Sequence, residues 1–326
     1  MTDLIKIPYL VLRPIYEKTS FHKAVISEIE DTKLRFAYSH CRSITRKHAK
    51  TFYMATRFLP YHKQRSIFAI YGLCRTLDDI VDESPAMIYQ NKRSKKQIID
   101  SLEKFRVQLI SAYRGMEQKN SVLIAFADVL NRYQISLEYP LTLLDGVKMD
   151  LVKNRYKNFD ELYEYSYKVA SVVGLMTTEV FGYKNSQAVD YAIDLGIAMQ
   201  LTNILRDVGE DLSKNRIYLP KEDLNQFGLT EKDLFQRELS ANFVELMKFQ
   251  IERAREYYHR ADKGIPMLEK DSRLPVLLAR ENYSRILDKI EENQYQVFNQ
   301  RAYLNSTEKF SILPKVMLQL RSDSTA

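Results

Sequence analysis

The sequence predicts an all-α protein made of a single domain, and three observations support this prediction. The chain has 326 residues, 45% of them hydrophobic, which is enough to bury one large core. It contains only 9 Gly and 9 Pro, and these are few turn-forming residues for a β fold with many turns. Long segments repeat apolar residues at the 3.6-residue spacing of an amphipathic helix, and no Gly/Ser-rich linker or internal repeat divides the chain.

The expected organisation is an N-terminal extension over residues 1–35, one domain over 36–320 and a flexible tail over 321–326. The extension carries a short apolar segment that either packs on the domain or lies loose, and it lacks the h-region and cleavage site of a secretory signal. Three amphipathic helices are the clearest in the domain, with Glu, Arg or Lys opposite the apolar stripe: residues 159–181, 242–261 and 274–297.

Two acidic clusters carry most of the information about function. Asp78 and Asp82 are four residues apart on a predicted helix, so both side chains project from one face. Asn203, Asp207 and Asp211 repeat this spacing over two turns of another helix. Apolar residues fill the intervening positions in both clusters, which indicates that both helices are largely buried. Carboxylates on buried helices are unfavourable unless a cation meets them.

A single cluster of this kind has an ordinary interpretation as solvated helix surface, but two matched, apolar-flanked copies favour a metal site. Oxygen ligands without a closed cage suit Mg²⁺, which keeps several waters and often bridges to substrate phosphates. We therefore predict a diphosphate–Mg²⁺ site, with Mn²⁺ as an alternative ion, held by Asp78, Asp82, Asn203, Asp207 and Asp211. Arg75 and Arg206 lie beside these acids and suit bidentate phosphate contact, although an ordinary ion pair explains Arg206 equally well.

Other classes of site find little support. The formal net charge is +7, but the basic residues are scattered and no aromatic–basic motif is present, so we expect no nucleic-acid partner. A polyanionic substrate and attraction to an anionic membrane surface are the favoured reasons for the charge. The 5 histidines include no i, i+4 pair, and 2 cysteines are too few for a zinc site or disulfide framework. No apolar run approaches the ~18 residues of a membrane span.

Three blocks of sequence resemble the phytoene/squalene synthase family. They are residues 48–52 with 71–83, residues 145–150 with 155–156 and 165–174, and residues 200–211 with 216–220, and they occur in family order. The resemblance extends over roughly residues 36–315 and is greatest toward the carotenoid branch. Ala49 departs from the family pattern, because many relatives carry a Ser there.

The resemblance implies an isoprenoid-synthase-type helical bundle around a central apolar cavity. It also implies a Mg²⁺-dependent prenyltransferase of the EC 2.5.1 class, which condenses two geranylgeranyl diphosphates head to head, through a cyclopropyl diphosphate, to phytoene. The same chemistry on farnesyl diphosphate, giving dehydrosqualene, presqualene diphosphate or squalene, is the alternative, and NADPH is needed only if the product is squalene. A terpene cyclase or prenyl diphosphatase and a non-catalytic assembly factor are further alternatives, and the intact acids argue against the last.

The same resemblance assigns the site residues. The expected catalytic residues are Tyr165, Arg75, Asp78, Asp82, Asp207 and Asp211. The expected substrate-binding residues are His48, Lys50, Thr51, Phe52, Tyr71, Arg75, Tyr165, Val169, Val173, Gln200, Asn203, Arg206, Arg216 and Arg280. Tyr165 is expected beside the leaving diphosphate, and a buried core tyrosine is its other interpretation.

The apolar channel is expected to be lined by Phe52, Thr56, Phe68, Val169, Ala170, Val173 and Gly174. Close packing of helices explains the small Ala170 and Gly174 equally well. Thr56 is small for a channel position, which favours a deep pocket and a C20 substrate over C15. We expect a cytoplasmic protein with reduced cysteines that associates weakly and peripherally with membranes, because a product without polar groups must leave into a bilayer. Prenyl diphosphates are the expected partners, and the oligomeric state is left open.

Overall fold

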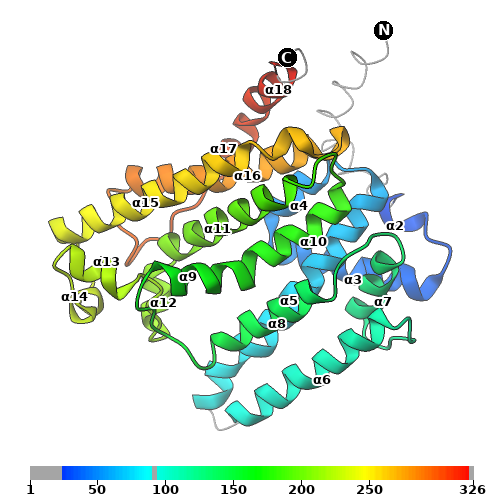
Figure 1. Ribbon diagram of the computed structural model, residues 1–326, viewed down its shortest axis with the longest axis horizontal. Coiled ribbons are helices and arrows are strands. Elements are labelled where there is room, and N and C mark those ends of the chain that lie inside the picture. Colours follow the sequence, from blue (N-terminus) through cyan, green and yellow to red (C-terminus); the bar gives the residue numbers. More distant parts are fainter. Residues whose placement is uncertain (1–23, 90–93, 323–326) are drawn as a thin grey trace.

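Helices make up almost the whole of the structure. The computed structural model describes residues 24–89 and 94–322, and in that part the only β pairing is two isolated bridges, Arg155 with Ile217 and Tyr183 with Leu268. The prediction of an all-α fold is confirmed (Figure 1). None of the helices in these described ranges is both long and apolar enough to cross a bilayer.

The first half of the chain packs around one long helix, α5. Its helices are α2 (Ala24–Ser27), α3 (Thr32–His48), α4 (Lys50–Thr56), α5 (Tyr61–Tyr89), α6 (Lys95–Tyr113), α7 (Ser121–Leu130) and α8 (Glu138–Met149). α5 contacts α2, α3, α6, α7 and α8. The packed structure thus begins before residue 36, and residues 1–23 of the expected extension lie outside the described residues.

Side-chain caps explain where several of these helices start. Asp31 accepts hydrogen bonds from the amides of Lys33 and Leu34 at the start of α3, and Ser94 forms a capping box with Gln97 at the start of α6. Caps of this kind satisfy amides that have no partner within the helix, and each stabilises it by about 1 kcal/mol.

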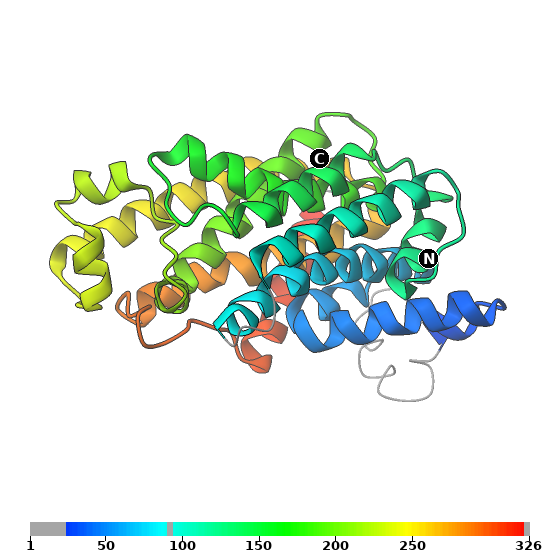
Figure 2. The same ribbon diagram turned by 90° about the horizontal axis from the view of Figure 1, so that it is seen from below.

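The second half of the chain packs around α11. It comprises α9 (Phe159–Ser166), the π-helical turn η2 (Tyr167–Ser171), α10 (Val172–Phe181), α11 (Ala188–Arg206), α12 (Val208–Ser213), α13 (Lys221–Gln226), α14 (Glu231–Gln236), α15 (Ala241–Asp262), the 3-10 turn η3 (Ile265–Met267), α16 (Lys270–Glu292), α17 (Ser306–Ser311) and α18 (Leu313–Ser322). α11 contacts α15, α16, α10 and η2. Figure 2 shows α13 and α14 at one end of the elongated bundle and α2 at the other. Residues 323–326 of the expected tail lie outside the described residues.

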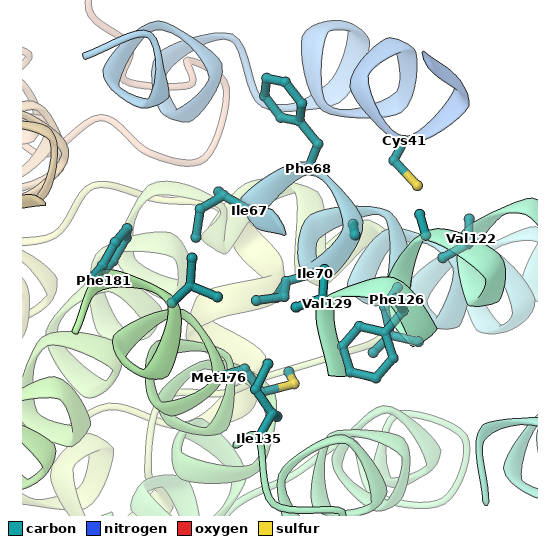
Figure 3. Close-up of a cluster of buried hydrophobic side chains, with 14 of the residues drawn as sticks. Cys41, Ile67, Phe68, Ile70, Val122, Phe126, Val129, Ile135, Met176 and Phe181 are labelled. Atoms are coloured by element: carbon teal, nitrogen blue, oxygen red, sulfur yellow. The ribbon is translucent and has the colours of Figure 1, made fainter. Parts of the chain in front are cut away.

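The hydrophobic core ties the two halves together. Figure 3 shows Ile67 and Ile70 of α5 gathered with Val129 of α7 and Met176 of α10, and all four side chains are buried. Burying a side chain of this size contributes about 1.5–3 kcal/mol. Through this core α10 packs on both α5 and α11, so it fixes the distance between the two acid-bearing helices.

The predicted helix over residues 159–181 is interrupted. A π-helical turn, η2, separates α9 from α10, and it lies where two neighbouring helices come very close. A Cβ on Gly196 of α11 would be 2.5 Å from Cα of Ser171, and one on Gly146 of α8 would be 2.7 Å from Cβ of Lys168. π-helical turns of this kind occur frequently at functional sites.

The other two predicted helices are present with shifted ends. Residues 242–261 lie within α15, whereas the helix predicted over 274–297 begins earlier, at Lys270, and stops at Glu292. Its end follows from the backbone, because Gln294 and Tyr295 both have positive φ angles, of 54° and 61°.

Candidate functional site

A cavity of about 560 Å³ lies between α4, α5, η2, α10, α11 and α16. Along α11 its lining changes from the apolar Ala188 and Leu195 to the polar Asn203 and Arg206. This stretch of helix is about 27 Å long at 1.5 Å per residue. The cavity therefore has an apolar end and a polar end.

The two ends differ sharply in chemistry. The polar end is lined by Asp78, Asp150, Asp207, Glu210, Asp211, Arg75, Arg206, Lys214 and Arg216. The apolar part is lined by Ala55, Leu59, Val173, Thr177, Phe181, Ile265, Leu268, Val276 and Ala279. Such a cavity suits a ligand with an anionic head and a long hydrocarbon tail.

The second acidic cluster does not lie on one continuous helix. α11 ends at Arg206, and Asp207 leaves the helical region with φ −104° and ψ 12° before α12 begins. The hydrogen bonds from Asp207 N to Asn203 O (3.0 Å) and from Asp211 N to Asp207 O (2.9 Å) nevertheless persist. The prediction of an unbroken helix is therefore wrong, while the three side chains still line one cavity.

Gly209 gives the physical reason for this break. A Cβ at Gly209 would lie 2.1 Å from the main-chain oxygen of Phe298, and Gly209 N donates to Val297 O at 3.2 Å. The chain leaves α11 to make this contact, which only glycine allows. The segment after α16 is thereby held against the second acidic cluster.

Two arginines hold the carboxylate of Asp207. Nε of Arg206 donates to Asp207 Oδ1 at 2.8 Å, and Nε of Arg301 donates to the same oxygen at 2.7 Å. Burial by itself would raise the pKa of Asp207, but the hydrogen bonds and charges of Arg206 and Arg301 outweigh it, so the pKa is lowered. Asp207 is therefore ionised at neutral pH.

Asp211 is in the opposite electrostatic situation. Burial and the negative charge of Asp207 raise its pKa to about 7, against a usual value of 3.8. Its neighbours Lys214 and Arg216 lower the pKa too little to compensate. Without a further cation, this carboxyl group is destabilised when it is ionised.

The first acidic cluster lies on α5. Asp78 lines the cavity, while the neighbouring Asp79 forms an ion pair with Arg75, which also lines it. Asp82 belongs to the same helix, but its side chain lies outside the described residues, so its predicted role stays a prediction.

The donor set at the polar end fits Mg²⁺. Asp78, Asn203, Asp207 and Asp211 supply only oxygen ligands, and the destabilised charge of Asp211 is one that a divalent cation would relieve. Among the side chains that the structure describes, no three His, Cys, Asp or Glu residues already form a closed metal-binding group. Mg²⁺ sites that bridge to substrate phosphates need only one or two carboxylates, so the open arrangement fits this ion.

Tyr165 belongs to a buried cluster of tyrosines on the wall of the cavity. Its hydroxyl donates to Asp150 Oδ2 at 3.1 Å, and the hydroxyl of Tyr218 donates to Asp150 Oδ1 at 2.9 Å. The ring of Tyr156 packs on both tyrosines, at 5.5 and 5.6 Å between centroids. Burial, reinforced by the charge of Asp150, raises the pKa of Tyr165 well above its usual range. Tyr165 is therefore both buried and cavity-lining, and its phenol stays protonated.

Most of the predicted site residues come together. Those that line the cavity are Phe52, Thr56, Tyr71, Arg75, Asp78, Tyr165, Val169, Ala170, Val173, Gly174, Gln200, Asn203, Arg206, Asp207, Asp211 and Arg216. They come from α4, α5, α9, η2, α10, α11 and the residues that follow α11.

Five predicted residues are placed elsewhere. His48, Lys50 and Thr51 lie at the junction of α3 and α4, outside the cavity lining, and partial burial and the charge of Arg75 lower the pKa of His48. Arg280 does not reach the cavity, because its guanidinium is held by Asp262 and Glu281. Phe68 stacks on Tyr53 in the core rather than lining the channel.

The sequence reasoning missed five residues of the polar end, namely Asp150, Glu210, Lys214, Tyr283 and Arg301. Asp150 and Glu210 stood inside recognised motif blocks without an assigned role, whereas Tyr283 and Arg301 lie far from any motif. Helical spacing after Arg206 was a usable signal for Glu210 and Lys214, which follow it at intervals of four residues. Arg301 reaches the site because the segment before it packs against Gly209. No local sequence pattern predicts this contact.

The sequence is similar to those of known proteins over most of its length. A family model described as squalene/phytoene synthase matches residues 45–308. The phytoene synthase of Arthrospira platensis is 42% identical over 298 residues, covering 87% of this chain and 94% of the relative. The 15-cis-phytoene synthase of Synechococcus elongatus is 40% identical over 295 residues, covering 87% and 93%.

Solved structures show the same architecture. A dehydrosqualene synthase crystallised with a ligand superposes with a TM-score of 0.81 at 29% identity, covering 89% of this chain and 98% of that one. A squalene synthase from Alicyclobacillus acidocaldarius, at 23% identity and a TM-score of 0.74, shares the fold. The fold and cavity define an isoprenoid-synthase type of enzyme. The chain belongs to the squalene/phytoene synthase family and is a prenyltransferase.

Proposed function

We propose that this protein condenses two geranylgeranyl diphosphates head to head, through a cyclopropyl diphosphate, to phytoene, with release of diphosphate, as a step of carotenoid biosynthesis. The observation that carries the proposal is a single cavity with carboxylates and arginines at one end and an apolar lining along the rest. The relatives named phytoene synthase, at 40–42% identity over most of the chain, support the same substrate and product.

The residues of the polar end bind and activate the diphosphate. Arg75, Arg206 and Arg216 present guanidinium groups that suit bidentate contact with phosphate oxygens. Asp78, Asn203, Asp207 and Asp211, with Asp82 by prediction, would hold Mg²⁺, which neutralises charge on the leaving diphosphate. Mn²⁺ is the alternative ion.

The apolar part of the cavity protects the cation that remains when diphosphate leaves. Its lining offers hydrocarbon side chains such as Leu59, Phe181 and Val276 to the prenyl tails. Thr56 lines the cavity but turns its hydroxyl to Tyr53 O at 2.8 Å, so no free polar group faces a chain there. Excluding water in this way keeps the cation from being quenched to an alcohol.

We further propose a C20 substrate and weak peripheral membrane association from the cytoplasm. The small side chain of Thr56 leaves depth for a longer chain, and a net charge of +7 favours an anionic surface. Farnesyl diphosphate is the alternative substrate, since a dehydrosqualene synthase is among the structures with the same fold.

Product analysis tests this proposal directly. The purified protein is incubated with C15 and C20 diphosphates, with and without Mg²⁺ and NADPH, and the products are identified by mass spectrometry. We expect phytoene from the C20 substrate in the presence of Mg²⁺, without a requirement for NADPH. Turnover of C15 alone would replace phytoene by dehydrosqualene or squalene, and turnover of one substrate molecule to an alcohol or cyclic terpene would reject condensation.

A further inference from the structure

The carboxylate of Asp150 bridges two phenols at the wall of the cavity. Asp150 follows α8, Tyr165 lies on α9 and Tyr218 follows α12, so three separate segments build this contact. Each phenol carries one proton, and both are donated to Asp150, one to each carboxylate oxygen. The oxygen of Tyr165 therefore keeps lone pairs that can accept a proton.

This arrangement changes the expectation for Tyr165. A hydroxyl that already donates its proton to Asp150 does not have it available for the leaving diphosphate. Tyr165 and Asp150 both line the cavity, and Tyr165 is only 4% exposed, so its hydroxyl group is buried at the cavity wall, where a bound substrate lies. A buried phenol with a carboxylate behind it is equipped to accept a proton rather than to give one.

Head-to-head condensation requires such an acceptor, and this step of the argument rests on the proposed function. Two C20 diphosphates become one C40 hydrocarbon whose two halves are joined by a carbon–carbon double bond. Each of the two electron pairs in that bond comes from a C–H bond that loses its proton, so each half of the reaction releases one diphosphate and one proton. In both halves a cation must lose that proton inside the cavity, away from water.

We propose that Asp150 is a positioning residue and the second member of a proton relay through Tyr165. The breaking C–H bond leaves its electron pair in the new carbon–carbon bond, and its proton passes to Oη of Tyr165. The phenolic proton of Tyr165 moves along the existing hydrogen bond to Oδ2 of Asp150, so the tyrosine ends neutral. Asp150 then passes the proton to the released diphosphate, which is a base that the proposed reaction supplies.

Tyr218 keeps Asp150 in place. Its hydroxyl occupies the other carboxylate oxygen and its ring stacks on Tyr165, 5.2 Å between centroids. Nη2 of Arg216 also lies 3.4 Å from the main-chain oxygen of Asp150. These contacts hold the carboxylate oxygen that faces Tyr165 in a fixed direction, as general acid–base catalysis requires.

A double-mutant cycle tests the relay in the full-length protein with Mg²⁺ and geranylgeranyl diphosphate. We expect Asp150→Asn and Tyr165→Phe each to lower kcat by about 10²-fold, with KM changed by less than about threefold. The double variant should be no slower than the slower single variant, because both act on one proton. Tyr218→Phe, which keeps the stacked ring, should lower kcat by only a few fold.

A second readout separates a relay from a structural role. If the cation cannot lose its proton, water or diphosphate captures it, so Asp150→Asn should raise the ratio of prenyl alcohols to phytoene. Asp145→Asn is the matched control, since Asp145 lies on α8, shortly before Asp150, but pairs with Arg106 at the surface. It should leave kcat and the product ratio unchanged.

An unchanged kcat in Asp150→Asn, or losses that multiply in the double variant, would overturn the relay. If Asp150→Asn does not fold by circular dichroism, the cycle of Tyr218→Phe with Tyr165→Phe makes the same test of coupling. Failure of the proposed function is distinguishable, because the unmodified protein would then form no phytoene at all.

Discussion

Arg301 reaches Asp207 across 94 positions of sequence, with its Nε 2.7 Å from Oδ1 of the carboxylate. Arg206 donates to the same oxygen, so two guanidinium groups hold the central acid of the second cluster. A cation that binds there competes with these arginines for Asp207. The contact depends on Gly209, against which the segment leading to Arg301 is packed.

Replacing Arg301 by Gln should strengthen metal binding in the absence of substrate. The loss of a partly exposed, charged hydrogen bond frees Asp207 for the ion, so the Mg²⁺ dissociation constant should fall by about three- to tenfold. Isothermal titration with Mg²⁺ alone measures this change. Arg114→Gln, at an exposed position after α6, is the control, and weaker Mg²⁺ binding by Arg301→Gln would show that Arg301 does not compete with the ion.

Removing a carboxylate from either acidic cluster should abolish most activity without unfolding the protein. We expect Asp78→Asn and Asp207→Asn to lower kcat by at least about 10²-fold, since each removes an oxygen ligand from the cation that stabilises the leaving group. Circular dichroism should show unchanged helicity. Asp100→Asn, on the exposed face of α6, provides the comparison, and near-normal turnover in either site variant at saturating substrate would reject the metal assignment.

The sequence predicts those features that depend on residues close together in the chain, and it does not predict those that depend on tertiary contacts. The helices and the pairing of the two acidic clusters follow from local periodicity, so Asp78 and Asn203 were found together with their metal-binding chemistry. The π-helical turn η2 was not predictable, because it results from the approach of Gly196 and Gly146 from two other helices.

The site itself was predicted where it is built from motifs and missed where it is built from tertiary contacts. Phe68 shares the apolar periodicity of channel residues, yet it stacks on Tyr53 of α4 in the core and does not line the cavity. Arg280 looked like a phosphate ligand, but Asp262 on the neighbouring α15 takes up its charge. Arg301 became visible only when the fold brought it to Asp207.

Asp211→Asn should stabilise the metal-free protein at pH 8 while it impairs catalysis. The folded-state pKa of Asp211 is about 7, above its usual 3.8, so the folded protein binds a proton that the unfolded chain has lost between these values. Stability from this group is thus complete at low pH and falls as pH rises toward 7. At pH 8 the ionised side chain destabilises the fold by an amount on the order of a few kcal/mol, and the amide removes that effect.

Thermal unfolding with chelator present measures this prediction. The variant should melt several degrees higher than the unmodified protein at pH 8. At pH 4 the difference should be much smaller, because Asp211 is then protonated in the folded protein and partly protonated in the unfolded chain as well. Mg²⁺ with inorganic diphosphate should raise the melting temperature of the unmodified protein at pH 8 more than that of the variant. Equal melting temperatures of the two metal-free proteins at pH 8 would contradict the electrostatic account of Asp211.

Thr56→Phe should shift the preferred substrate from C20 to C15. Thr56 lines the cavity and is only 3% exposed, so a phenyl ring at this position occupies space that a prenyl tail would fill. A C20 tail exceeds a C15 tail by five carbons, and at about 0.8 kcal/mol per buried CH₂-sized group that depth is worth several kcal/mol to the longer substrate. Competition between the two diphosphates, read as the ratio of C40 to C30 product, measures the shift. Met54→Phe adds a ring on the same helix outside the cavity lining and should leave the ratio unchanged, whereas an unchanged ratio in Thr56→Phe would place the length-determining contact at another wall of the cavity.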